Sequence, residues 1–238
     1  MNYKTHIYSL GLLFFFIQFG FSQTSVMEVL EMSLKTSEQF STFSCNLDYK
    51  YFPTYVSEEH TANYKGVLIK DELDSFLKIK ETIFLTNHNS KTVLKVNKLQ
   101  KAMSISNNLD MPSNMDYLSN LRDIISQFDA KELTETTTTW KCILVAPEIS
   151  QLPYSKVELY INKSDNMITK QVLYISAQFP YNDEDGRQMA NPRLEISVTD
   201  HKTLIEPEQK KLLDLDNYIH KKNGKIVPVK AYKNYQIL

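Results

Sequence analysis

Apolar and polar residues alternate along many short segments of this chain, and this period-two pattern restricts the fold more than any other feature. Between residues 43 and 51, Phe, Cys, Leu and Tyr alternate with Ser, Asn, Asp and Lys. Successive side chains of a β-strand point to opposite faces, so the alternation predicts a strand with one face buried. Similar segments follow at 61–70, 73–86, 91–97, 100–106, 131–138, 140–146, 155–162, 167–178 and 193–200. Short strands joined by turns predict an antiparallel meander.

Several segments carry more detailed expectations. The apolar residues of 73–86 are expected to share one face of the sheet, and these are Leu77, Ile79, Ile83 and Leu85. The segment 179–192 is polar and contains two prolines, which predicts an exposed loop. Asn223-Gly224 is the strongest hairpin signal in the chain, so 212–238 is predicted to form a hairpin extension. This extension is expected to cover the mouth of the sheet.

Two segments have the three-to-four spacing of amphipathic helices. The first is 24–39, where Thr24 or Ser25 can cap the helix and Glu28 stands at the position of a capping box. The second is 114–128, whose apolar stripe consists of Leu118, Leu121, Ile125 and Phe128.

The two helices are too small to cover the predicted sheet. A helix of about 15 residues spans about 22 Å, and a sheet of about ten strands is wider at about 4.8 Å per strand. Two arrangements remain open. The sheet closes on itself and fills its interior with side chains, or an incomplete barrel keeps an apolar hollow for a ligand.

The amino-terminal residues have the three-part pattern of a secretory signal peptide. Lys4 supplies the positive charge, 7–17 is apolar, and Gly20 and Ser22 are the small residues before a cut after Ser22. The alternative is a membrane anchor, but an apolar run of about 11 residues is shorter than the about 20 needed to cross a bilayer. We therefore expect 1–22 to be removed and the mature chain to be periplasmic or secreted.

The mature chain, 23–238, is predicted to form a single β-rich domain that does not span a membrane. Its 26 basic and 28 acidic residues give a net charge of −2, which argues against a nucleic-acid partner. Two cysteines, Cys45 and Cys142, remain. In an oxidising compartment they form either a disulfide, worth about 4–5 kcal/mol in the chain-entropy model, or two buried free thiols on separate strands.

No catalytic, cofactor or metal motif stands out in the sequence. The histidines His60, His88, His201 and His220 lack metal-ligand spacing, and we expect each to be exposed or hydrogen-bonded. Asp183, Asp185 and Gly186 match part of a calcium loop, but the remaining ligands are missing, so a solvated turn is expected. We therefore predict a non-enzymatic protein without a cofactor.

The order of the elements resembles that of the periplasmic outer-membrane lipoprotein carriers, the LolA-like family. The resemblance covers about residues 26–200 and lies in an amphipathic helix followed by STFSCNLDYKY, YKGVLIKDELDSFLKIK and VELYINKSDNMITKQVLYI. It implies an α+β fold, a mainly antiparallel half-open β-barrel of about ten or more strands, with helices packed on or into its concave side. The residues that would then line the hollow are Leu47, Tyr49, Leu77, Ile79, Val157, Leu159 and Ile161.

Two functions follow as expectations. The first is an exported envelope protein that carries or senses a lipid, a lipoprotein acyl chain or another hydrophobic ligand. The second is a protein–protein interaction module of a cell-envelope assembly, which uses its strand edges or the tail tyrosines Tyr218, Tyr232 and Tyr235.

Overall fold

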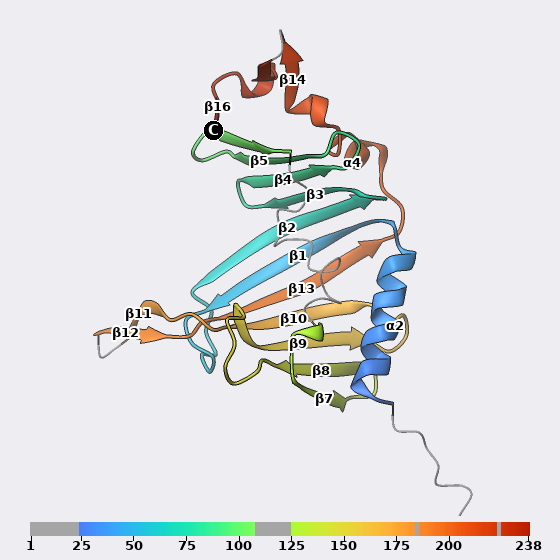
Figure 1. Cartoon of the computed structure of the whole chain (residues 1–238), viewed down its shortest axis with the longest axis vertical. Coiled ribbons are helices and arrows are strands. Elements are labelled where there is room, and N and C mark those ends of the chain that lie inside the picture. The colour runs from blue at the N-terminus through green and yellow to red at the C-terminus, as the bar shows by residue number, and fades with distance from the viewer. Residues whose placement is uncertain (1–23, 108–124, 184–185, 223–224) are drawn as a thin grey trace, which may run out of the picture.

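The structure is a computed structural model, and it describes residues 24–107, 125–183, 186–222 and 225–238. Its centre is one curved sheet of 12 strands (Figure 1). The strand order is β16-β6-β5-β4-β3-β2-β1-β13-β10-β9-β8-β7, so the sheet is open and has β16 and β7 at its two ends. All neighbouring strands are antiparallel except β16, which runs parallel to β6. The prediction of a mainly antiparallel sheet of ten or more strands is confirmed.

Two meanders supply most of the strands. The first consists of β1 (Thr42–Phe52), β2 (Ala62–Asp71), β3 (Asp74–Ile79), β4 (Thr82–Asn87), β5 (Thr92–Asn97) and β6 (Ala102–Ser106). The second consists of β7 (Ala130–Glu135), β8 (Thr139–Val145), β9 (Tyr154–Asn162) and β10 (Ile168–Ile175). The late strand β13 (Arg193–Lys202) pairs with β1 on one side and with β10 on the other, and so joins the two meanders.

The pairing register defines the two faces of this sheet, because residues directly opposite each other on neighbouring strands share a face. One row crosses β1, β13, β10, β9 and β8, and it consists of Tyr49, Ile196, Gln171, Leu159 and Cys142. We call the face that carries this row the inner face, and the opposite one the outer face.

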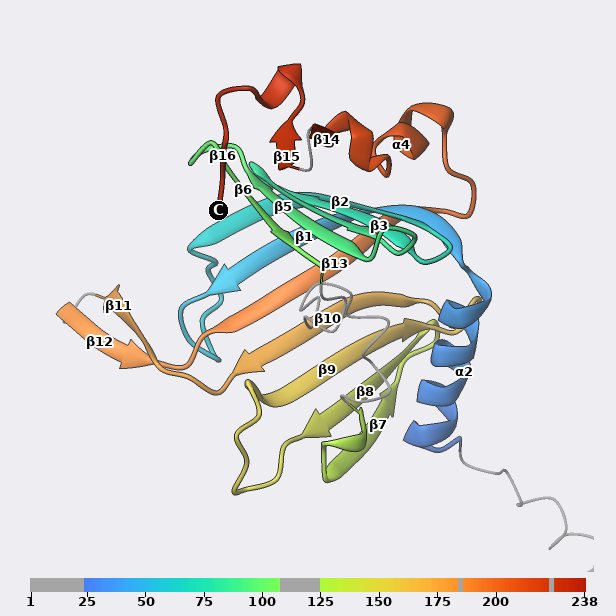
Figure 2. The ribbon, with the colours of Figure 1, turned by 45° about the horizontal axis from the view of Figure 1, so that its top comes forward.

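Helix α2 (Val26–Gln39) covers one end of the inner face and packs against β7 and β8 (Figure 2). The Ser25 hydroxyl accepts from the Glu28 amide, and the Glu28 carboxylate accepts from the Ser25 amide, so the predicted capping box is confirmed. The helix buries Val29, Leu30, Ser33 and Leu34. Of the second predicted helix, 114–128, only 125–128 lies within the described residues, and Ile125 and Phe128 are buried in the same cluster as α2.

The carboxy-terminal segment, 207–238, packs on the outer face of β2 to β6. It contains α4 (Pro207–Lys211), the 3-10 turns η2 (Leu215–Asn217) and η3 (Lys230–Tyr232), the hairpin β14 (Ile219–Lys222) and β15 (Lys225–Pro228), and β16 (Gln236–Ile237). Its residues Leu213, Tyr218 and Ile219 share a buried cluster with outer-face side chains such as Phe76 and Leu85. The predicted hairpin is present, but the expectation that the extension covers the mouth of the sheet is wrong. The outer face of β2 to β6 is itself apolar and needs this cover.

Two further expectations from the pattern are wrong. The segment 73–86 is a hairpin, β3 and β4, with a turn at Lys80-Glu81. A two-residue turn pairs Leu77 with Phe84 and Phe76 with Leu85, so the alternation changes face at the turn. Leu77 and Ile79 therefore lie on the inner face, whereas Ile83 and Leu85 lie on the outer face.

The segment 179–192 is also not a loop. It forms a second small hairpin, β11 (Phe179–Asp183) and β12 (Gly186–Ala190), which extends away from the 12-stranded sheet (Figure 1). Among the described strands, β11 and β12 pair only with each other. Neither face of this small sheet packs on a core, so its sequence lacks the alternation of apolar and polar residues that predicts a strand.

Candidate hydrophobic-ligand site

All seven residues that the sequence singled out lie on the inner face. Tyr49 and Leu159 belong to the row that defines it, and Leu47 is linked to Ile79 through their common partner Gly66. The other three, Leu77, Val157 and Ile161, lie in the rows on either side. They come from β1, β3 and β9, so the fold brings together segments about 110 residues apart in one continuous apolar layer.

Most of this layer is closely packed. Leu47, Leu77, Val157, Leu159 and Ile161 are buried, and all five belong to one cluster with the apolar face of α2. The remaining two, Tyr49 and Ile79, are partly exposed and pack against that cluster. These two are therefore the inner-face positions at which a ligand meets side chains with accessible surface.

Helix α2 covers only a strip of the inner face. Its axis runs across the strands, at one end of β13, β10, β9 and β8 (Figure 1). Strand β9 has nine residues and is therefore about 30 Å long, whereas a helix with its side chains is about 10–12 Å wide. Among the described elements, α2 therefore packs on one end of the inner face and not along the whole length of the strands.

Gly66 lies in this layer, and its lack of a side chain leaves room for the Tyr49 ring. A methyl group at position 66 would lie 3.1 Å from the Tyr49 ring and 3.1 Å from the Lys78 carbonyl oxygen, so the ring rests directly on the glycine backbone. Burial, and to a lesser extent the proximity of Cys45, raises the pKa of the Tyr49 phenol. Tyr49 is therefore a neutral, polar-tipped aromatic side chain within the apolar layer.

Two polar side chains are buried in this apolar region, and the sequence analysis missed both. Gln171 is 5% exposed and lies between Ile196 and Leu159 in the central row. Ser33 is fully buried on the sheet-facing side of α2, and its hydroxyl has no hydrogen-bond partner among the described residues. The alternation of 167–178 contained a signal for Gln171, because the glutamine occupies an inward position where the pattern otherwise places apolar residues.

Both cysteines also lie on the inner face, Cys45 on β1 and Cys142 on β8, where they are free and buried. Strands β13, β10 and β9 lie between them in the sheet. Burial raises the pKa of each thiol to about 12, so both stay protonated at neutral pH.

The outer face of β8, β9 and β10 carries lysine and tyrosine side chains around the buried carboxylate of Glu158. Glu158 is 5% exposed and accepts contacts from Lys141 and Lys156, each at 3.0 Å. The hydroxyls of Tyr160 and Tyr174 donate to the same carboxylate at 3.2 and 3.1 Å. Burial by itself would raise the pKa of Glu158, but the hydrogen bonds and charges of the two lysines outweigh it and lower that pKa.

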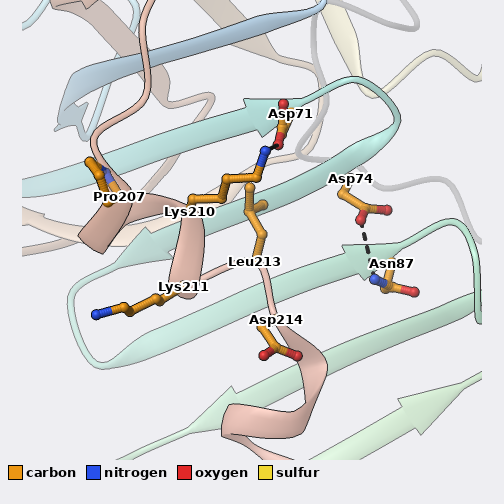
Figure 3. A pocket seen from close by; sticks show the side chains of 8 residues that line it. All are labelled: Asp71, Asp74, Asn87, Pro207, Lys210, Lys211, Leu213 and Asp214. Carbon is orange, nitrogen blue, oxygen red and sulfur yellow. Dashed lines mark hydrogen bonds and ion pairs between the residues drawn. The ribbon is translucent and has the colours of Figure 1, made fainter.

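A hollow of about 440 Å³ lies on the outer side, between the ends of β2 to β4 and the carboxy-terminal segment (Figure 3). Lys210 bridges the two parts through Asp71 at 2.9 Å, and the Thr42 hydroxyl donates to the same carboxylate at 3.0 Å. The Asn87 amide donates to Asp74 at 3.2 Å. The hydrogen bond from Lys210 lowers the pKa of Asp71. These charges attach the carboxy-terminal segment to the sheet.

Within residues 24–107, 125–183, 186–222 and 225–238, no three His, Cys, Asp or Glu side chains gather closely enough to hold a metal ion. No helix in the same ranges combines the length and apolar character needed to cross a bilayer. His201 differs from the expected exposed or hydrogen-bonded histidine, because it stacks on Phe43 at 5.3 Å and its buried Nε2 has no hydrogen-bond partner in the part of the chain that the structure describes.

Comparisons with known proteins come from structures alone, because no family model and no curated protein matches the chain. A DUF1329 family protein from Desulfovibrio piger has a TM-score of 0.38 and 9% identity, over 82% of this chain and 99% of that one. LprF from Mycobacterium bovis has a TM-score of 0.37 and 10% identity, over 77% and 97%. A LolA superfamily protein from Nitrosomonas europaea has a TM-score of 0.29 and 10% identity, over 82% and 99%. The last is named for the superfamily that the sequence pattern resembles.

Proposed function

We propose that this chain is an exported envelope protein that binds a hydrophobic ligand on the inner face of its open sheet and acts as a non-enzymatic carrier or sensor. The ligand class is a lipid or the acyl chain of a lipoprotein. The observation that carries the proposal is the apolar layer of the inner face, which continues from β8 to β3, whereas α2 packs on one end of the strands. Apolar surface left in water costs about 25 cal/mol per Å², so this layer favours an apolar partner.

The residues proposed to line the ligand site are the seven on the inner face: Leu47, Tyr49, Leu77, Ile79, Val157, Leu159 and Ile161. Tyr49 and Ile79 are proposed to touch the ligand directly, since both keep accessible surface. The other five form the packed floor beneath it.

Native mass spectrometry of the protein purified from cells tests the proposal. We expect an added mass that disappears on delipidation, and uptake of a fluorescent fatty acid by the delipidated protein. Ile79→Asn should weaken that uptake about tenfold, because it places an amide in the apolar layer. Ile226→Asn is the matched control on the exposed hairpin β14–β15 and should leave uptake unchanged. A ligand-free mass together with no fatty-acid uptake would contradict the proposal.

A second candidate is an interaction module of an envelope assembly, and one observation favours it. The hairpin β11–β12 projects from the sheet and exposes Phe179 and Met189 by 46% and 57%. The tail tyrosines support it less, because Tyr218 is 3% exposed and stacks on Tyr232 within the outer-face cluster. A pull-down from the native host with the intact chain and with a Phe179→Ser/Met189→Ser variant tests this candidate. Partners that both forms retain equally would contradict a role for the hairpin.

A further inference from the structure

Lys80 places a positive charge beside the accessible part of the inner face. It follows Ile79 in the turn between β3 and β4, and its Nζ lies 3.4 Å from the centre of the Tyr64 ring. Tyr64 is directly opposite Tyr49 in the pairing of β1 with β2, so its ring lies on the inner face. The face of an aromatic ring attracts an ammonium group. Lys80 therefore stands next to Ile79 and Tyr49, the two residues proposed to touch the ligand.

Lys95 adds a second cation to the same face. It is opposite Phe84 of β4, and Phe84 is opposite Leu77 of β3, so all three residues share the inner face. The Nζ of Lys95 lies 5.5 Å from the centre of the Phe84 ring, and both lysines are exposed. Leu77 and Ile79 are neighbours on this face of β3, so the two cations adjoin the same part of the apolar layer.

The carboxylates of strands β1 to β6 all lie on the opposite, outer face, and they are Asp48, Asp71 and Asp74. There, Lys65 pairs with Asp48 at 2.9 Å. Among the residues that the structure describes, no carboxylate forms an ion pair with Lys80 or Lys95, and this includes Glu81 next to Lys80 in the turn. The inner face of these six strands thus combines cations with apolar surface and carries no acidic side chain.

We infer that the ligand of the inner face is an anionic amphiphile, whose carboxylate or phosphate group pairs with Lys80 and Lys95 while its hydrocarbon lies on the apolar layer. This inference rests on the proposed function and adds the charge of the ligand. An ammonium group on a ring keeps N–H donors for an anion, and the adjoining apolar layer strengthens their attraction because it excludes water. From β3 to β9 the layer crosses five strand spacings, about 24 Å, which gives an acyl chain room to lie extended.

The test compares charged and neutral competitors for a neutral fluorescent fatty alcohol bound to the delipidated full chain. The first pair is hexadecanoate and hexadecanol at low salt and about pH 8, where the carboxylic acid is ionised. The intact protein should bind the acid about tenfold more tightly, and 1 M salt should reduce this preference, because exposed charges are screened. The second pair is a phosphatidic acid and the diacylglycerol with the same chains. A preference in the first pair alone assigns a carboxylate to the site, and a preference in the second alone assigns a phosphate.

Three double variants connect the preference with the two lysines. Lys80→Gln/Lys95→Gln should bind charged and neutral competitors equally, and Lys80→Arg/Lys95→Arg should keep the preference because it keeps both charges. Lys78→Gln/Lys91→Gln is the matched control. It also removes two positive charges, but Lys78 lies on the outer face of β3 and Lys91 in the turn at the other end of β4. This control should keep the tenfold preference.

The outcomes separate the inference from the proposed function. Equal binding of charged and neutral competitors by the intact protein in both pairs overturns the inference and leaves the hydrophobic site standing. The same holds if the preference survives in Lys80→Gln/Lys95→Gln or is lost equally in the control. Failure of the intact protein to bind the fluorescent alcohol and all four competitors overturns the proposed function as well. A lowered Tm of Lys80→Gln/Lys95→Gln without ligand, together with loss of the preference in the arginine variant, assigns the lysines to the fold and overturns the inference.

Discussion

The two ends of the sheet bury opposite faces. From β2 to β6 the outer face is apolar, and the chain covers it with its own carboxy-terminal segment. From β7 to β10 the inner face is apolar and packs on α2, while the outer face carries a lattice of lysines, tyrosines and Glu158. Strands β2 and β3, near the change-over, are apolar on both faces: Leu68 and Leu77 point inward and Ile69 and Phe76 outward.

The difference shows which part of the apolar surface the protein covers with its own elements. The outer apolar cluster is closed by a segment whose charged residues fasten it to the strand ends. Among the described residues, the inner layer receives a helix at one end of its strands, and Tyr49 and Ile79 keep accessible surface. The closed face behaves as an ordinary core, and the inner layer is where we propose the ligand.

Substitutions at two neighbouring residues of β3, one on each face, should give the largest effects on stability and uptake. Phe76→Ala should lower the free energy of unfolding by about 3–5 kcal/mol, because it opens a cavity in the outer cluster. Leu77→Ala should cost about 2–3 kcal/mol and should also reduce fatty-acid uptake. Urea unfolding of the delipidated variants measures the first effect, and fluorescence titration measures the second. If Phe76→Ala abolishes uptake in folded protein and Leu77→Ala preserves it, the ligand site lies on the outer face.

Glu158→Gln tests the charged outer face of β7 to β10, and we expect an intermediate loss in the free energy of unfolding. The loss of two charge-assisted contacts should cost about 2 kcal/mol at pH 7, since both lysines remain about one-third exposed. The pKa of Glu158 is lowered from its ordinary value of 4.5, so this stability is present above pH 4.5 and is lost as the pH falls through the folded-state pKa. The difference between the intact protein and the variant should therefore shrink on acidification.

Chemical unfolding at several pH values between about 3 and 7 measures this difference. Glu132→Gln is the matched control, because Glu132 is exposed on the edge strand β7, two strands from β9. It should change stability by less than about 0.5 kcal/mol. A pH-independent effect of Glu158→Gln would show that the carboxylate charge is not what stabilises this face.

The smallest effect is expected at the attachment of the carboxy-terminal segment. Lys210→Ala removes the ion pair with Asp71, and limited proteolysis of 207–238 should become faster at low salt. The difference should vanish in 1 M salt, because exposed ion pairs are screened. Lys211→Ala is the control, since Lys211 pairs with Glu208 on the same helix and does not bridge to the sheet. Equal acceleration in both variants would mean that the bridge to Asp71 is not what holds the segment.

Much of this architecture was predictable from local pattern. The capping residues Ser25 and Glu28 define the start of α2, and the alternation of 43–51 identifies β1 and the inward direction of Leu47 and Tyr49. Such signals act over a few residues, and the sequence displays them directly.

What the sequence did not reveal depends on partners that are distant in the chain. Alternation cannot show which face a strand buries when both faces are apolar, so Ile83 and Leu85 were assigned with Leu77 instead of opposite it. Similarly, nothing in the sequence around the carboxy-terminal tyrosines indicates that they pack in the outer-face cluster. Gln171 was missed because a single polar residue in a strand looks like ordinary variation until its neighbours are known.

The position of β13 has a consequence for how the chain folds. Asn46 of β1 donates a hydrogen bond to Asp200, 154 positions later, and β13 fills the gap between β1 and β10. Until residues 193–202 have paired, β1 keeps one unpaired edge and the two meanders remain separate pieces. Long-range strand pairing is slow to form, and open strand edges favour aggregation. The insertion of β13 is therefore the step that removes this edge.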